Sequence, residues 1–239
     1  MYQGRDDMAM IYSEVPCNEA GTFTTNLVKA APVKWDQEIV YHAPSAQAVI
    51  INAGIANACT GAEGYGYCRA TADAAADILK IPANAVLVAS TGVIGMQIPI
   101  HKIVAGVQVM SGTLDGSLES GTNSARAIMT TDTKKKEIAV TVELGGKTVT
   151  IGGRRYLTND TVLLLANGLA GNPEITEKNE DYEAFKAALH VVNETLAKKI
   201  AGDGEGCTAL FEVKIVGAES KELGSKSSGN QWKRRWPRR

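Results

Sequence analysis

Thr91 and Gly92 follow a short apolar run at residues 86–89, and this pair is the first candidate for chemistry. The run is short, β-branched and closed by turn-forming residues, which predicts a buried strand. A glycine directly after a strand lets the backbone turn sharply and bring its N–H groups close to a ligand. The pair would then offer a hydroxyl and a backbone donor to one oxygen atom, as an oxyanion hole requires. The alternative is a strand-to-loop turn that binds nothing.

Two further stretches combine carboxylates with small or hydroxyl residues. Residues 130–133 read Thr-Thr-Asp-Thr, a cluster that could position a substrate amine or a nucleophile, or could form a capped turn. Residues 202–206 alternate glycine with Asp203 and Glu205, and a carboxylate between glycines is expected to be exposed and open to a cationic ligand. No Gly-Lys-Ser/Thr follows, so this is not a phosphate-binding loop. A functional Glu205 and a solvated turn are equal alternatives.

Cysteine and histidine spacing predicts neither a metal site nor a disulfide framework. The four cysteines lack paired Cys-x-x-Cys spacing, and the three histidines lie far apart in the chain. These residues are Cys17, Cys59, Cys68, Cys207, His42, His101 and His190. Reduced thiols, as in cytosolic proteins, are therefore expected.

The elements that must position the candidate residues alternate between strands and helices, which predicts an α/β or α+β fold. The predicted elements are strands at 48–51, 86–90 and 210–216, helices at 70–80, 101–110 and 179–200, and a β-hairpin at 137–151. Residues 111–124 are predicted to form a loop with a weak helical turn. Thr158 or Asn159 could cap a helix over residues 162–166, although the β-branched start counts against it.

Polar residues at the ends of these elements carry the remaining local predictions. Asn52 and Asn57 lie in the loop after the first strand, where they could meet a ligand or satisfy the backbone of their own turn. Asn179 is expected to cap the last helix at its N-terminus, and Gly202 lies where a C-capping glycine belongs.

Composition and charge describe an ordinary globular chain with a basic end. The 239 residues are 44% hydrophobic and 21% charged, enough for one large domain or two small ones. No apolar run is long enough to cross a bilayer and the start lacks a signal core, so a cytoplasmic protein is expected. The net charge is −1, but residues 221–239 hold seven basic residues and one acid, so the tail carries +6 and the rest of the chain −7.

Taken together, these stretches resemble the ornithine acetyltransferase family, whose members carry out glutamate N-acetyltransferase chemistry in arginine biosynthesis. The specific matches are Ala-Ser-Thr-Gly-Val-Ile-Gly at residues 89–95 and Met-Thr-Thr-Asp-Thr at residues 129–133. Supporting matches lie at residues 13–16, 21–26, 52–61, 158–173 and 203–208. The resemblance covers most of residues 8–220.

The resemblance implies an acyltransferase that moves acetyl from N-acetylornithine to glutamate by a ping-pong route. Family members cut their own chain before a threonine, whose freed amine and hydroxyl act as base and nucleophile. By position, Thr91 and Gly92 match the oxyanion-hole pair, and Thr130 and Glu205 match substrate-binding residues. The implied fold is an α/β (α+β) sandwich with mixed sheets flanked by helices. No cofactor and no metal are implied, because the acetyl group travels on the protein, and intact members assemble as oligomers of α/β halves.

The chain departs from the family where the nucleophile should lie. Gly153 runs through Arg-Arg-Tyr-Leu straight into Thr158, so a block of residues is missing, and no residue matches the nucleophilic threonine or a substrate-binding lysine. The resemblance divides the chain into an α-chain-like region at 1–153, a β-chain-like remnant at 154–222 and an unrelated basic tail at 223–239. We expect the chain as written to be inactive and to lack part of its core.

Other interpretations stay open. A related self-cleaving aminopeptidase would share the fold, but it also needs a released threonine or serine. A non-catalytic scaffold could hold an amino acid through Glu205 and Thr130. The basic tail could bind nucleic acid by stacking Trp232 and Trp236 on bases. The acidic body opposes that, so the expected partners are small molecules, with no nucleic acid and no membrane.

Overall fold

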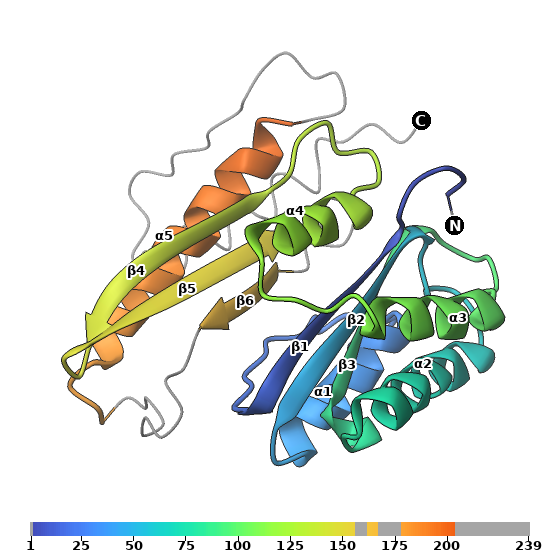
Figure 1. The fold of residues 1–239 in the computed structure, drawn as a ribbon, viewed down its shortest axis with the longest axis horizontal. Coiled ribbons are helices and arrows are strands. Elements are labelled where there is room, and N and C mark those ends of the chain that lie inside the picture. The colour runs from blue at the N-terminus through green and yellow to red at the C-terminus, as the bar shows by residue number, and fades with distance from the viewer. Residues whose placement is uncertain (1, 156–161, 167–177, 204–239) are drawn as a thin grey trace. The chain divides into compact units, whose positions relative to one another are not determined.

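The computed structural model describes residues 2–155, 162–166 and 178–203, and Figure 1 shows their elements. In chain order they are β1 (Met8–Cys17), α1 (Ala31–His42), β2 (Ala46–Ile55), α2 (Glu63–Leu79), the 3₁₀ turn η1 (Ala83–Ala85), β3 (Val86–Val93), α3 (Ile100–Ser111), α4 (Leu118–Ala127), β4 (Glu137–Leu144), β5 (Lys147–Arg155), β6 (Val162–Ala166) and α5 (Tyr182–Ala201). The predicted α/β class is confirmed. None of the helices in the described ranges is both long and apolar enough to cross a membrane.

The first sheet has the strand order β1–β2–β3, with β1 antiparallel and β3 parallel to β2. Its helix-covered face packs against α1, α2 and α3, which gather on one side of the sheet in Figure 1. Ile50 and Val88 from the strands meet Ala72 and Val107 from the helices in this core. The alanines of α2 let the helix lie close to the strands, as its small-residue face predicted.

Side chains of α1 cover the open edge of β3. Trp35 donates from Nε1 to the Val86 carbonyl at 2.9 Å, and the Val88 N–H donates to Asp36 Oδ1 at 2.9 Å. An edge strand exposes unpaired backbone groups that invite aggregation, so these two bonds close part of the edge. Sequence analysis did not predict α1, although Pro32 suits the first turn of a helix.

Replacing Asp36 with asparagine is expected to stabilise the chain in a pH-dependent way. Burial raises the pKa of Asp36 to about 7, although its bond from Val88 acts in the opposite direction. The folded pKa exceeds the ordinary value, so this carboxyl's stability contribution is complete below about pH 4 and is lost as pH rises towards 7. Asparagine keeps an acceptor without the charge, so Asp36→Asn should raise the free energy of unfolding near pH 8 by at most about 4 kcal/mol.

Urea unfolding at the two pH values checks this expectation. The Asp36→Asn variant should gain little near pH 4, because the wild-type carboxyl is already protonated there in the folded state. An equal gain at both pH values would contradict the assigned cause.

The second sheet has the order β4–β5–β6, antiparallel throughout, and the predicted β-hairpin is confirmed. Gly145 and Gly146 join its strands with φ of 56° and 72°, the left-handed conformations that a type I′ turn requires. In Figure 1, α5 runs along β4 and β5. Its buried residues, Val192 and Leu196, pack against Ile151 and other side chains of the hairpin.

Three predictions about these elements are wrong. The helix predicted from residue 70 begins at Glu63, because packing extends it beyond the amphipathic stretch. A helix, α4, occupies much of the predicted loop at 111–124, and the Ser117 side chain caps it by accepting from the Ser120 N–H at 3.1 Å. Residues 162–166 form strand β6, because pairing with β5 outweighs the helical preference of the leucines.

The ends of α5 also differ from prediction. Asp181, not Asn179, occupies the N-cap position, and Asn179 Oδ1 accepts from the Asp181 N–H at 2.8 Å to form a turn before the helix. Gly202 follows the helix as predicted, but with φ of −80° it is right-handed and needs no glycine.

Candidate functional site

The predicted oxyanion pair lies at the carboxyl ends of two parallel strands. In the β2–β3 ladder, Thr91 pairs with Ala53 and Gly92 with Gly54. Gly92 was predicted to follow the strand, but it lies inside β3, and the turn begins beyond Val93. Ligand sites commonly form at the carboxyl ends of parallel strands, so the location suits a binding site.

Close strand pairing explains why residue 92 must be glycine. Its φ is +133°, and a Cβ built there would lie 2.3 Å from the Gly54 carbonyl carbon and 2.6 Å from the Ile55 nitrogen. Any side chain would push β3 away from β2. Glycine serves the ladder here, a reason independent of any ligand.

Thr91 and its neighbours project to opposite faces of the sheet, since side chains alternate along a strand. Ala89 packs in a small cluster with Ile51 on the face away from α1, α2 and α3, and Thr91 shares that face. Thr91 is only 3% exposed. The strand continues into an apolar, exposed tip in which Val93 and Ile94 are each 58% exposed.

Ser90 joins the ends of β2 and β3 on the opposite face. Its hydroxyl donates to Asn52 Oδ1 at 2.7 Å and accepts from the Asn57 N–H at 3.0 Å. Asn52 also donates to the Ile55 carbonyl at 2.8 Å. Nothing in the local sequence around Ser90 predicted that this residue joins the two strand ends.

Asn57 is buried and organises the loop that follows β2. Its Nδ2 donates to the Gly64 carbonyl at 2.8 Å, and its Oδ1 accepts from the Thr60 hydroxyl at 2.8 Å. Of the two roles considered for Asn52 and Asn57, the structure shows both satisfying local backbone. They hold the loop beside the predicted oxyanion pair.

Thr130 lies just after α4, in a segment anchored on the first sheet. Ile128 is buried and packs with Ala9 and Ile51, on the face that carries Thr91. The Thr130 N–H donates to Asp132 Oδ2 at 3.3 Å, which is the capped turn considered above. Ile128 thus holds the Thr130 segment against the sheet face that leads to Thr91.

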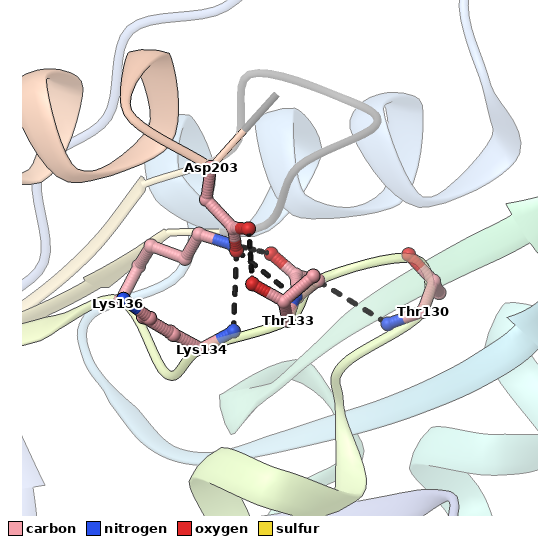
Figure 2. Close-up of polar contacts among 6 residues, drawn as sticks. Thr130, Thr133, Lys134, Lys136 and Asp203 are labelled. Carbon is pink, nitrogen blue, oxygen red and sulfur yellow. Dashed lines mark hydrogen bonds and ion pairs between the residues drawn. The ribbon is translucent and has the colours of Figure 1, made fainter. Parts of the chain in front are cut away.

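Asp203 is buried, contrary to the exposed carboxylate expected between glycines. Figure 2 shows Lys136 and Thr133 converging on its carboxylate. The Thr133 and Lys134 N–H groups donate to Asp203 Oδ2 at 3.0 and 3.2 Å, and the Lys136 ammonium forms an ion pair with it. The Lys136 ammonium lowers the pKa of Asp203 most and the Thr133 hydroxyl next, so this pKa lies well below its usual range. Internal partners outweigh the flexibility of the flanking glycines.

Several predicted residues lie outside the described residues. They are Glu205, Thr158, Asn159, Cys207, the strand predicted at 210–216 and the basic tail at 223–239. Within residues 2–155, 162–166 and 178–203, no three histidine, cysteine, aspartate or glutamate side chains group as metal ligands would. The structure therefore connects Thr91, Gly92 and Thr130 through one sheet, and leaves Glu205 as a prediction.

Comparison with known proteins gives consistent matches. The family model described as the ArgJ family matches residues 1–156 and 154–229. The arginine biosynthesis bifunctional protein ArgJ of Thermotoga neapolitana is 38% identical, over 91% of this chain and 66% of its own length. The Symbiobacterium thermophilum protein of the same name is 41% identical, over 90% of this chain and 65% of its own length. The chain thus spans slightly less than two thirds of these relatives.

Two solved structures also match. A crystal structure of ArgJ from Bacillus halodurans has a TM-score of 0.61 and 35% identity, over 68% of this chain and 85% of its own. Ornithine acetyltransferase from Mycobacterium tuberculosis, complexed with ornithine, has a TM-score of 0.52 and 35% identity, over 71% of this chain and 83% of its own.

The alignments are longer than the part of this chain that they cover. The Thermotoga alignment has 266 positions, whereas 91% of the 239 residues is about 217, so about 49 positions have no counterpart here. The two ranges of the family match meet at residues 154–156, after the β4–β5 hairpin. A missing block was expected after Gly153, next to this junction, and that block stays a prediction.

Proposed function

Because this chain belongs to the ArgJ family, we propose that it retains the ligand-binding and oxyanion-stabilising parts of an ornithine acetyltransferase without its nucleophile. It would bind N-acetylornithine and glutamate, the acetyl donor and acceptor of that reaction, and transfer no acetyl group. The observation that supports this proposal is the surplus of about 49 aligned positions, together with the division of the family match at residues 154–156. The resemblance leads us to expect the nucleophilic threonine at that junction.

In the complete reaction, a threonine hydroxyl attacks the acetyl carbonyl carbon of N-acetylornithine. The carbonyl oxygen gains negative charge, which the Thr91 hydroxyl and the Gly92 N–H are proposed to stabilise. The bond from the acetyl carbon to the ornithine nitrogen then breaks, that nitrogen takes a proton, and the acetyl group stays on the threonine oxygen. The amine of glutamate attacks this ester, takes the acetyl group and frees the threonine.

This chain would supply the ligand-binding and oxyanion-stabilising contacts of that reaction, but not its covalent step. Thr91 and Gly92 sit at the end of β3, and Thr130 is anchored to the same sheet through Ile128. Glu205 is proposed to hold the α-amine of the ligand. Without the threonine no ester forms, and oxyanion stabilisation alone leaves a small residual effect. The aminopeptidase alternative meets the same difficulty, because it needs the same freed residue.

The test is N-acetylglutamate formation from N-acetylornithine and glutamate by the purified chain, together with calorimetric titration of N-acetylornithine and ornithine. We expect heat of binding and no turnover above the buffer background. Turnover would show that a nucleophile exists elsewhere, and Thr130→Ala and Thr131→Ala would then identify it. Absence of binding with a folded chain would overturn the ligand-binding half of the proposal.

A further inference from the structure

The Asp132–Lys136–Asp203 cluster joins two segments that lie far apart in the chain. The Lys136 ammonium contacts carboxylate oxygens of both Asp132 and Asp203. The three side chains are 2%, 6% and 8% exposed for Lys136, Asp132 and Asp203, so this is a buried network and not a surface pair. Asp132 belongs to the segment after α4, and Asp203 follows α5.

Each carboxylate also orders backbone next to a predicted ligand residue. Asp132 accepts from the Thr130 N–H, and Asp203 accepts from the Thr133 and Lys134 N–H groups. Figure 2 shows the bonds of Thr133 and Lys134 to the Asp203 carboxylate. Asp203 also stands two positions before Glu205 in the chain. The Lys136 ammonium therefore holds the segment that contains Asp132 next to the segment that contains Asp203.

The charge balance explains why Lys136 is needed. Two buried carboxylates would repel each other, and removing one partner of a buried ion pair leaves a charge with no compensation. The Thr133 hydroxyl and the two N–H groups stabilise Asp203 further, so the carboxylate stays ionised and fixed.

We propose that Lys136 is a positioning residue for the amino-acid ligand: it holds the Thr130 segment against Asp203 and so fixes the position of Thr130. This inference rests on the proposed function, since that function assigns Thr130 to the ligand site. Lys136 itself does not touch the ligand. Its effect is transmitted through the carboxylates of Asp132 and Asp203.

The chain offers matched variants to test this. Lys136→Met keeps the stem and removes the charge, and Lys136→Arg keeps the charge. Lys135→Met is the control, because the neighbouring Lys135 pairs with Glu137 at 2.8 Å with side chains 30% and 38% exposed. The hydrophobic contacts of α5 with β4 and β5 do not involve Lys136, so α5 should stay packed in every variant.

Ornithine binding is measured by calorimetry, and hydrogen exchange of the Thr130, Thr133 and Lys134 amides is measured without ligand. Lys136→Met should weaken ornithine binding at least tenfold and speed exchange of these amides at least tenfold, with far-UV circular dichroism unchanged. Lys136→Arg should stay within about threefold of wild type, and Lys135→Met should match wild type. If Lys136→Met unfolds, it is replaced by the double variant Lys136→Met/Asp203→Asn. This variant removes one of the two carboxylate charges that Lys136 paired, and it should fold but bind ornithine at least tenfold more weakly.

The outcomes separate the two proposals. Wild-type ornithine affinity in a folded Lys136→Met chain, or unchanged amide exchange, overturns the positioning role. Wild-type affinity in the double variant overturns it as well. If the wild-type chain binds no ornithine while the three amides still lose protection in Lys136→Met, the proposed function fails and the link between the two segments stands.

Discussion

The Gly92→Ala chain is expected to lose at least about 3 kcal/mol of unfolding free energy, a large part of the stability of a typical domain. Two costs add at this position. The new Cβ would meet the Gly54 carbonyl carbon at 2.3 Å, and that atom belongs to the backbone of β2 and cannot rotate away. A φ of +133° is also a conformation that residues with a side chain rarely adopt.

Gly95→Ala is the matched control for Gly92→Ala. Gly95 has a φ of +81°, but a Cβ built there meets no atom within 4 Å. It should therefore show only the conformational cost, about 1 kcal/mol. Urea unfolding of both variants followed by circular dichroism checks the difference. Equal losses would mean that close packing of β2 and β3 is not the reason for glycine at residue 92.

The Gly153→Ala chain is expected to lose about 1–3 kcal/mol through overpacking of the second sheet. A Cβ on Gly153 would lie 2.5 Å from Leu164 Cδ2, 2.5 Å from Val192 Cγ1 and 3.0 Å from Leu196 Cδ1. These atoms come from β6 and α5, so the missing side chain lets the helix and the strand close over β5. Unlike the backbone next to Gly92, these side chains can shift, which makes the expected loss smaller.

Gly152→Ala provides the comparison within the same strand. Its Cβ would lie 3.9 Å from the Leu165 carbonyl oxygen and 4.0 Å from that of Ile138, which are ordinary contacts. We expect Gly152→Ala to stay within about 0.5 kcal/mol of wild type in urea unfolding. A loss at Gly152 as large as that at Gly153 would rule out packing of α5 as the cause.

The elements that the sequence predicted correctly are those whose signals come from residues close together in the chain. The hairpin at 137–151 combines alternating apolar residues with two glycines at a tight turn, and both signals lie within a few positions of each other. The amphipathic stretch of α5 and the β-branched run of β3 are similar cases. Residues 162–166 are different, because an apolar run of this length suits a helix or a strand, and only pairing with β5 decides.

The sequence by itself determined the α/β class and the family resemblance. It also supplied the candidates Thr91, Gly92, Thr130 and Glu205 and the expected missing block after Gly153, which stay predictions. The cytoplasmic location, the absence of cofactor and metal, the assembly into oligomers and the three-part division of the chain stay predictions. The location follows from residue types and the other three chiefly from the family resemblance, and no described contact bears on them.

Only the tertiary structure decided which polar residues hold the site together. Ser90 binds Asn52 and Asn57 across the strand ends, and Lys136 binds Asp203 from a segment 67 residues away in the chain. Glycines around Asp203 favour exposure when the sequence is considered locally, but a buried ammonium and two N–H donors outweigh that preference. The physical reason is that a buried charge requires a partner, and the fold alone determines which distant residue supplies it.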